Sequence, residues 1–516
     1  MIYDILLLIY LVGTVAGLWF VFGKAGLAPW KALVPVYNIV LWIRLCGKSW
    51  RWYIYMFVPA VNVFCFLLLV QETARVFRRY SFWEQLAAAL FPFVYLPWLG
   101  LDKKCRYVDP RVEKPAKVGE GRDWLDAIVF ALIAATIIRG NIFELYQIPS
   151  SSMEKSLLVG DHLMVSKLAY GPRVAMTPLS LPLMHNVVPL IGGKSYFDHP
   201  QLPYHRYWGY SEVKRFDAVV FNFPAGDTIL SGFPDGKYTY YQALNDFGRE
   251  AVWSGRQTID IGEGPVPLGK PVVRPLDKRE NYIKRCIGMP GDTLEVRNHV
   301  VYINGRALQT PAEAQTTYLV VVNAIQARPQ MMLHEVGVSY DDISAALYNA
   351  EQLGNAYGMV LPLTPTMASR LAKRYDVLDV QPIDAPADPT LYPSLADSVQ
   401  SIDNYGPVHI PAKGQVLQLD AKTLPMYRRV IEAYEGNTLE VRGDQILVNG
   451  QPATTYTVRQ NYYWMMGDNR HHSQDSRYWG YVPEDHIVGR AKTILWSWDK
   501  DRQGLFKFRG RLFKKV

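Results

Sequence analysis

The sequence has little cysteine and no clustered metal-binding pattern. Its 516 residues include only four cysteines, Cys46, Cys65, Cys105 and Cys286, and these lack the short spacings of a metal site. Only Cys286 lies in the long polar region that follows residue 143, so a disulfide framework inside that region is excluded. We interpret Cys286 as a small buried apolar residue rather than a reactive thiol.

The chain also lacks a strong charge of one sign. Its formal net charge of +8 is modest for this length, and no basic cluster with interleaved aromatic residues is present. This pattern favours contact with the anionic lipids of a bilayer over binding of nucleic acid. The length exceeds one ordinary hydrophobic core, so several domains are expected. Nothing in the sequence indicates a cofactor or an oligomeric state.

Hydrophobic segments dominate the N-terminal part. Ile2–Gly23 is long enough to cross a bilayer, and its start carries no Lys or Arg, unlike a cleaved signal peptide. Further apolar runs lie at 52–70 and 82–101. Residues 28–46 are apolar but interrupted by two prolines and two basic residues, which is typical of an interfacial or re-entrant helix.

A further apolar segment, Trp124–Phe143, is the predicted membrane anchor. It is short for a span, and Arg139 would have to extend toward the interface. The basic residues ahead of it are Lys103, Lys104, Arg106, Arg111, Lys114, Lys117 and Arg122. The positive-inside rule places them in the cytoplasm and the chain after Phe143 outside it. We therefore predict a multi-pass protein of the plasma (inner) membrane, with the number of earlier spans left open.

The polar region has the pattern of a β domain. We expect strands at 160–171, 217–223, 281–287, 462–466 and 486–496. A fifteen-residue repeat, Gly291–Gly305 and Gly436–Gly450, predicts two hairpins that each close on Asn-Gly. The run 174–191 carries no Lys, Arg, Asp or Glu, and is either a loop in the lipid headgroups or a core strand.

An insertion, 309–433, separates the two copies of the repeat. Its helical candidates are 340–353, 365–375 and 421–434. We predict a mostly β fold with an inserted α+β accessory subdomain, preceded by an α-helical transmembrane region. The domain boundaries are 1–123 for the membrane region, 124–143 for the anchor, 144–308 and 434–516 for the two parts of the β domain, and 309–433 for the insertion.

Two residues form a candidate nucleophile and base. Ser152 lies in I-P-S-S-S-M-E-K-S-L at 148–157, which alone is most often a turn with capping hydroxyls. Lys284 shares one face of a predicted strand with Tyr282 and Cys286, although a strand lysine is usually solvated. A buried lysine loses its proton readily, and the neutral amine can take the proton of a serine hydroxyl.

A third polar segment, 467–483, reads G-D-N-R-H-H-S-Q-D-S-R-Y-W-G-Y-V-P between two apolar strands. Alone it is a polar loop. His471 and His472 are adjacent rather than spaced on one face, which makes them poor ligands for one ion. The sequence therefore predicts no metal.

Four segments together resemble the signature segments of bacterial type I signal peptidases. They are I-P-S-S-S-M at 148, G-D-H-L-M-V-S-K at 160, Y-I-K-R-C-I-G-M-P-G-D at 282 and G-D-N-R-H-H-S-Q-D-S-R-Y-W-G at 467. The resemblance covers about 138–498 without the insertions. It implies a mostly β, signal-peptidase-like catalytic domain on the outer face of the plasma membrane.

The resemblance also assigns roles. It implies that Ser152 is the nucleophile, that Lys284 is the general base, and that the Ser150 hydroxyl and the Ser152 backbone N–H form the oxyanion hole. Exported preproteins with small residues at the first and third positions before the cleaved bond would be the substrates.

In the third segment, the resemblance implies that Ser473 holds the lysine amine and that Asp475 and Arg477 brace the loop. The chain departs from the family at Ser151, where glycine is usual, and at His471-His472, where Asp-Asn is usual. If position 151 needs a positive φ, a serine there adds strain.

The main hypothesis is thus a membrane-bound serine endopeptidase that removes signal peptides. A catalytically inactive membrane scaffold or secretion partner on the same fold is the alternative. A self-cleaving transcriptional repressor would use a similar Ser/Lys pair, but membrane segments stand where its DNA-binding helices would be.

Overall fold

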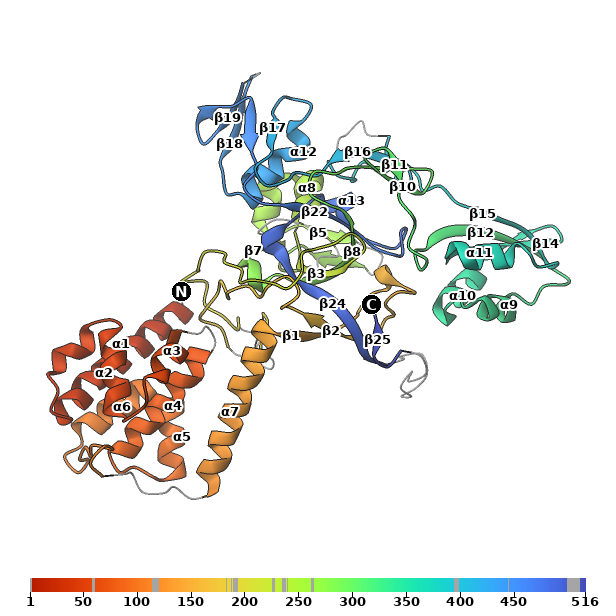
Figure 1. The fold of residues 1–516 in the computed structure, drawn as a ribbon. Helices are drawn as coiled ribbons and strands as arrows, with labels where there is room; N and C mark the ends of the chain where they lie inside the picture. Colours follow the sequence, from red (N-terminus) through yellow and green to blue (C-terminus); the bar gives the residue numbers. More distant parts are fainter. Residues whose placement is uncertain are drawn as a thin grey trace. The chain divides into compact units, whose positions relative to one another are not determined.

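The chain folds into two compact units (Figure 1). The computed structural model describes residues 2–57, 61–113, 120–181, 183–186, 188, 194–224, 228–233, 238, 240–260, 264–393, 399–443, 445–498 and 511–516. One unit contains Met1–Gly140 with Thr177–Leu202, and the other contains Asn141–Met176 with Pro203–Val516. The first is mainly helical and the second mainly β.

The helical unit consists of short helices apart from its first and last. Its α-helices are α1 (Ile2–Lys24), α2 (Tyr37–Leu45), α3 (Arg51–Phe57), α4 (Val61–Val76), α5 (Phe82–Leu90), α6 (Pro92–Leu101) and α7 (Glu120–Asn141), with a 3-10 turn at Pro29–Leu33. Helices α1 and α6 pack closely, because Gly17 lies where a Cβ would come within 2.4 Å of the Leu96 Cβ.

The membrane spans predicted from the sequence find no support in this unit. Among the described residues, no helix combines the length and the apolar character needed to cross a bilayer. The predicted run 82–101 is divided, because α5 ends at Leu90 and Pro92 begins α6. Proline is well suited to a first helical turn and poorly suited to an interior, which explains this division. In the predicted run 52–70, residues 58–60 lie outside the described residues. Part of the predicted basic loop, 114–119, lies outside the described residues.

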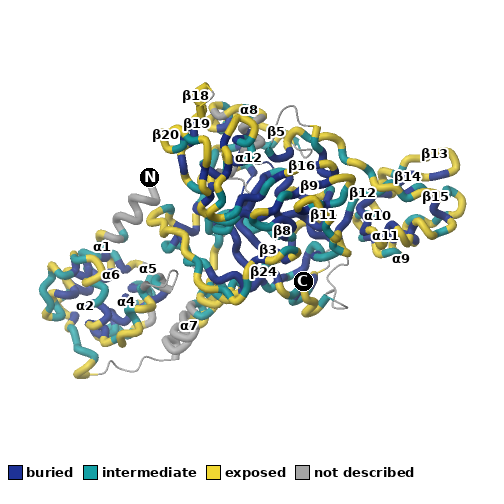
Figure 2. The backbone as a smooth tube through the Cα atoms, turned by 45° about the horizontal axis from the view of Figure 1, so that its top comes forward, coloured by how far each residue is buried: buried dark blue, intermediate teal, exposed yellow. Residues whose placement is uncertain are grey.

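The β unit is built on an antiparallel sheet of order β1-β2-β24-β3-β8-β22-β23, with β25 (Lys514–Lys515) paired to β24. Its strands are β1 (Phe143–Gln147), β2 (Asp161–Ser166), β3 (Ala218–Asn222), β8 (Asn281–Gly288), β22 (Tyr462–Met466), β23 (Val482–Pro483) and β24 (Ile487–Ser497). The central strands β3, β8 and β24 are largely buried (Figure 2). Of these, β3 reads A-V-V-F-N, a continuous run that suits a strand covered on both faces.

The two copies of the repeat form hairpins, as predicted. They are β9 (Thr293–Arg297) with β10 (Val300–Ile303), and β18 (Leu439–Arg442) with β19 (Gln445–Val448). The first joins a four-stranded sheet of order β11-β10-β9-β16, where β11 is Arg306–Ala307 and β16 is Tyr405–His409.

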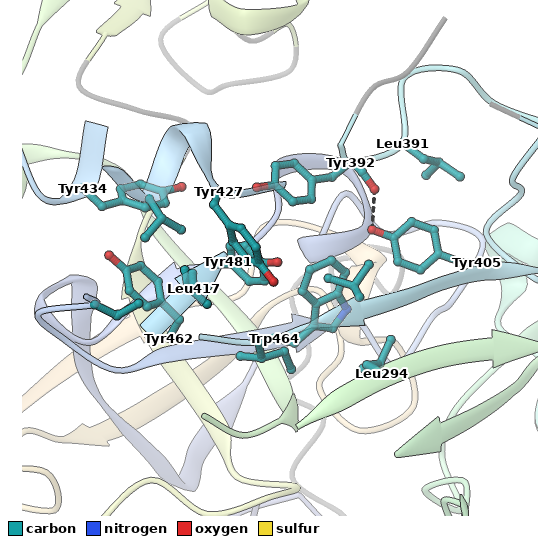
Figure 3. Close-up of a cluster of buried hydrophobic side chains, with 14 of the residues drawn as sticks. Leu294, Leu391, Tyr392, Tyr405, Leu417, Tyr427, Tyr434, Tyr462, Trp464 and Tyr481 are labelled. Carbon is teal, nitrogen blue, oxygen red and sulfur yellow. Dashed lines mark hydrogen bonds between the residues drawn. The ribbon is translucent and has the colours of Figure 1, made fainter. Parts of the chain in front are cut away.

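An aromatic core underlies this hairpin and β22 (Figure 3). Its large buried side chains are Tyr392, Tyr405, Tyr427, Tyr434, Tyr462, Trp464 and Tyr481. The Tyr405 hydroxyl donates a hydrogen bond of 2.5 Å to the Tyr392 carbonyl, so this polar group is satisfied inside the core. The core therefore supports β22, the strand that leads directly into residues 467–475, the Gly467 loop.

The predicted insertion contains a lobe with its own core. Strands β12 (Thr316–Asn323), β13 (Glu351–Leu353), β14 (Ala356–Leu363) and β15 (Val377–Pro382) form a sheet, joined by α9 (Pro329–Val336), α10 (Tyr340–Tyr348) and α11 (Pro365–Leu371). Val320, Leu333, Met359 and Leu371 are among its buried residues. The helix expected at 340–353 ends at Tyr348, and its last residues form β13 instead.

The remaining elements are small. They are β4 (Thr228–Leu230) with β7 (Pro271–Val273), β5 (Thr258–Asp260) with β6 (Pro265–Pro267), β17 (Val416–Gln418) with β21 (Thr455–Thr457), β20 (Gln451–Pro452) beside β19, and helices α8 (Tyr240–Ser254), α12 (Leu424–Arg429) and α13 (Ser476–Trp479). In the apolar run 174–191, the described residues form no strand, and 182, 187 and 189–191 lie outside the described residues.

Candidate active site

The serine-rich turn is held at the start of the main sheet. The Ile148 N–H donates to the Asp161 carbonyl (2.9 Å) and the Gly160 N–H donates to the Ile148 carbonyl (3.0 Å), which fastens the turn to β2. Ile148, Met153 and Leu157 are buried in one cluster, while Ser152 lies between them in a single 3-10 turn. Packing on both sides thus fixes the backbone that carries the Ser152 hydroxyl.

Lys284 reaches this hydroxyl from the middle of the sheet. It lies on β8, opposite Val219 of β3, and its Nζ is 2.7 Å from the Ser152 Oγ. Both residues are buried, with 3% of Lys284 and 9% of Ser152 exposed. The structure therefore brings together the two residues that sequence analysis paired across 132 positions.

The surroundings of Lys284 disfavour its charged form. Burial lowers the pKa of its amine from 10.5 to about 8, and the carboxylates of Asp475 and Asp468 offset only part of this effect. The ammonium also lies 5.7 Å from the centre of the Tyr282 ring. A lysine of this kind is neutral in a useful fraction of molecules near neutral pH.

The Gly467 loop clamps the backbone of the serine turn. The Asn469 N–H donates to the Ser152 carbonyl (3.1 Å), and its side-chain amide donates to the Ser151 carbonyl (3.3 Å). A Cβ on Gly467 would come within 2.2 Å of the Ser473 Oγ and 2.6 Å of the Ser152 carbonyl oxygen. Glycine is thus required where the two segments meet.

A buried ion pair stiffens the same loop. The Arg477 guanidinium contacts the Asp475 carboxylate through Nε–Oδ1 (2.9 Å) and Nη2–Oδ2 (2.8 Å), and Nη2 also donates to the Arg470 carbonyl. Asp475 Oδ2 further accepts a hydrogen bond from the Gly467 N–H (3.0 Å). Burial opposes both charges, but the contact raises the pKa of Arg477 and lowers that of Asp475.

The other predicted serines lie close by without strong contacts. The Ser150 Oγ is 3.4 Å from the Ser152 Oγ, and Ser150 is exposed. Ser151 is not among the described non-glycine residues with positive φ, so it carries no left-handed strain. The Ser473 Oγ is buried, and in the described part of the chain it has no hydrogen-bond partner, Lys284 included.

Sequence reasoning missed a second ionic contact at the site. Asp468 binds Arg285 through Nε–Oδ1 (2.7 Å) and Nη2–Oδ2 (2.5 Å), and it also accepts a hydrogen bond from the Ser156 hydroxyl (2.5 Å). Arg285 follows Lys284 and points to the opposite face of β8. No local pattern pointed to this contact, because a charged residue on a strand is usually solvated.

The lobe of the insertion also contacts the Gly467 loop. The Gln315 N–H donates to the Asp468 carbonyl (2.8 Å), and the Arg470 N–H donates to the Gln315 carbonyl (2.9 Å). The first strand of the insertion therefore begins directly beside the loop that clamps Ser152.

A buried serine hydroxyl 2.7 Å from a buried lysine, whose pKa is lowered by desolvation, is an arrangement that a peptidase can use. A family model described as signal peptidase, peptidase S26, matches residues 121–338 and 453–496, together just over half of the chain. The chain therefore belongs to the signal peptidase family S26 and is a peptidase of that family. Residues 30–110, within the helical unit, match a family of unknown function (DUF5684).

Individual relatives agree with the family. Signal peptidase I of Buchnera aphidicola subsp. Acyrthosiphon pisum is 23% identical over 370 residues, which cover 72% of this chain and 73% of the relative. Signal peptidase I of Haemophilus influenzae is 24% identical over 392 residues, covering 75% and 74%. A shorter match, 38% identical over 82 residues, links the chain to signal peptidase I of Leptolyngbya laminosa and covers 13% of this chain and 40% of that one.

Proposed function

We propose that this peptidase cleaves signal peptides from exported preproteins with Ser152 as nucleophile and Lys284 as general base. The observation that carries the proposal is the 2.7 Å contact between the Lys284 Nζ and the Ser152 Oγ in a buried setting. No histidine is needed, because desolvation already gives the lysine a pKa at which it can accept a proton.

The reaction follows from this contact. The neutral Lys284 amine takes the Ser152 hydroxyl proton as the oxygen attacks the carbonyl carbon of the scissile peptide bond. The resulting oxyanion accepts hydrogen bonds from the Ser150 hydroxyl and the Ser152 N–H. The lysine then gives its proton to the leaving amine, and the C–N bond breaks. Water, activated by the same amine, hydrolyses the Ser152 ester and restores both groups.

The loop residues support the base. The Asp475–Arg477 pair fixes the loop that contains Ser473, and the buried Ser473 hydroxyl is available to the Lys284 amine as a hydrogen-bond partner when substrate excludes water from the site. In this arrangement Ser473 is a positioning residue for the base rather than a reacting group.

The proposal includes preproteins with small residues at the first and third positions before the bond, and a site on the extracytoplasmic side of the plasma membrane. Support for the location comes from the apolar sequence of Ile2–Gly23 and Trp124–Phe143 and from the basic residues ahead of Trp124. Flotation of the full chain with lipid vesicles in a density gradient tests the membrane association.

The deciding experiment is cleavage of a purified preprotein by the full chain. We expect wild type to release the mature protein, and Ser152→Ala and Lys284→Ala each to lower the rate by about 10³-fold or more. Ser151→Ala is the matched control: it removes the neighbouring exposed hydroxyl and should retain activity close to wild type. Cleavage by Ser152→Ala at the wild-type rate would contradict the proposed nucleophile, and an inactive wild type would favour the scaffold alternative.

A further inference from the structure

Three side chains that take no part in the proposed reaction converge in the β unit. His299 lies in the turn between β9 and β10, Asp403 lies just before β16, and His471 lies in the Gly467 loop. One ligand atom from each lies within 4.8 Å of the others. Their side chains are 16%, 3% and 10% exposed, respectively, so the cluster is largely shielded from water.

The carboxylate of Asp403 is aimed at both rings. Its Oδ1 is 2.9 Å from the His299 Nδ1 and 2.9 Å from the His471 Nε2. Its Oδ2 accepts a hydrogen bond from the Ala385 N–H (2.8 Å), which fixes the orientation of the group. One oxygen is therefore committed to the backbone, and the other faces two imidazole nitrogens.

The other nitrogen of His299 has a carboxylate partner as well. Asp384 Oδ1 is 2.9 Å from the His299 Nε2, and Asp384 is itself 72% exposed. A carboxylate on one ring nitrogen holds the proton there and leaves a lone pair on the other nitrogen. The His299 Nδ1 is buried and has no hydrogen bond of acceptable geometry in the described structure, despite its distance to Asp403. Where Nδ1 carries no proton, its lone pair faces the Asp403 oxygen, and a cation between the two atoms would stabilise that arrangement.

The backbone at His299 is unusual for its residue type. Asn298 and His299 have φ values of 47° and 68°, the left-handed conformation that a two-residue hairpin turn demands. Glycine would meet this demand with less strain at the second position. A histidine at this turn, with its ring directed into a polar cluster, points to a role for that ring.

We propose that His299, Asp403 and His471 bind a divalent transition-metal ion of the zinc class. Two imidazole nitrogens and one carboxylate oxygen are a donor set that Zn²⁺ accepts, with water in the fourth position. Tetrahedral bonds of about 2.1 Å place ligand atoms about 3.4 Å apart, so each 2.9 Å pair needs to widen by only about 0.5 Å. Asp384 is the outer carboxylate that orients His299.

The ion would restrict the movement of the Gly467 loop. His471 is two residues before Ser473 and four before Asp475, whereas His299 and Asp403 come from a turn and a segment on the other side of the contact. Binding would tie the Gly467 loop to the first hairpin of the repeat. The adjacent-histidine argument from sequence missed this arrangement, because the second histidine of the cluster is His299 and not His472.

The test is zinc binding by the full-length protein after removal of metal with a chelator. Zn²⁺ is titrated against a chromophoric competitor, and the melting temperature is measured with and without Zn²⁺. We expect one equivalent to bind and to raise the melting temperature. His471→Gln and His299→Gln should each weaken binding by more than about 100-fold and abolish the thermal shift, and Asp384→Asn should weaken binding by about 10- to 100-fold.

His472→Gln is the matched control, since His472 is adjacent to His471 and exposed. It should bind Zn²⁺ as wild type does. Equal binding by wild type, His471→Gln and His299→Gln, or no binding by wild type, would overturn the proposal in favour of a metal-free histidine–aspartate network. The assay is repeated on Ser152→Ala, where zinc binding should persist, so that failure of the proposed catalytic role and failure of the metal site are distinguishable.

Discussion

Two buried cations beside the Gly467 loop have opposite environments. Arg477 is 1% exposed and contacts both oxygens of the Asp475 carboxylate. Lys284 is 3% exposed, and among the described residues it donates a hydrogen bond to the Ser152 hydroxyl. The carboxylates of Asp475 and Asp468 act on it through charge alone. The pKa of Arg477 is raised, while the pKa of Lys284 is lowered to about 8.

The difference shows how one site combines rigidity with reactivity. A paired charge is held in place by directional hydrogen bonds, and its protonation does not change near neutral pH. An unpaired amine in the same low-polarity environment exchanges its proton within the useful pH range.

The largest effect is expected from Asp475→Asn. This change leaves the Arg477 guanidinium buried without its counterion and weakens the contact to the Gly467 N–H. Removing one partner of a buried ion pair costs about 3–5 kcal/mol, so we expect the unfolding free energy to fall by that amount. The rate of cleavage should fall as well, because the Gly467 loop loses its brace. Urea denaturation followed by circular dichroism measures the unfolding free energy.

Glu440→Gln is the matched control for this prediction. Glu440 and Arg442 have the same two-residue spacing as Asp475 and Arg477, but their side chains are 52% and 73% exposed. An exposed pair contributes about 0–1 kcal/mol. If the two variants lost the same stability, the buried pair would not be the brace described above.

Local patterns in the sequence predicted much of this arrangement. The alternation around Lys284 predicted strand β8, and the two alternating strands in each copy of the repeat predicted both hairpins. The Asn-Gly of each copy lies after the second strand of its hairpin. The resemblance to signal peptidases, which the family match confirms, indicated which serine and which lysine to compare. Strands and hairpins can be predicted from the sequence because they depend on a two-residue alternation of side chains and on turn residues within a few positions.

Contacts between distant segments were not predictable in the same way. The approach of Asp403 to His471 and of Gln315 to Asp468 depends on how the insertion folds back, which no local pattern encodes. The N-terminal helices illustrate a second limit. Apolar composition predicted spans, whereas the break at Pro92 divides the run 82–101 into shorter helices.

A second prediction concerns Lys284→Met, which should raise stability while abolishing cleavage. The unfolded chain binds a proton on Lys284 up to a pKa of 10.5, and the folded chain only up to about 8, so folding is penalised below that range. This penalty on the folding free energy of wild type amounts to about 3 kcal/mol at pH 7. The gain over wild type should shrink as pH rises from about 8 to 10.5.

Lys492→Met serves as the control for the stability gain, because Lys492 is an exposed lysine on β24 of the same sheet. Its stability should change by no more than about 0.5 kcal/mol. Equal gains in the two variants would show that removal of any strand lysine stabilises the sheet.

The pH dependence of cleavage tests the lysine directly. Below about pH 8 the Lys284 amine becomes protonated and cannot accept the serine proton, so kcat/KM should fall about tenfold per pH unit. Glu154 requires a control, because burial raises its pKa to about 7. Glu154→Gln should leave the midpoint near 8, and a midpoint that moves with Glu154 would assign the titration to that residue.

The smallest effect is expected from Ser473→Ala. The Ser473 hydroxyl is buried without a hydrogen-bond partner in the described residues, so its removal should leave the unfolding free energy unchanged or raise it by about 1 kcal/mol. If the hydroxyl binds the Lys284 amine during the reaction, kcat should fall by about tenfold, with KM unchanged and the pH midpoint displaced.

Ser476→Ala separates the two readouts, since the Ser476 Oγ accepts a hydrogen bond from the Met465 N–H (2.9 Å). We expect this variant to lose about 1 kcal/mol of stability with the pH midpoint retained. A Ser473→Ala enzyme with wild-type kcat and midpoint would leave Lys284 positioned by burial and by Ser152 alone. The contrast with Arg477 would then be complete, because Arg477 is held by three directional hydrogen bonds, and Lys284 by burial and by the hydroxyl that it deprotonates.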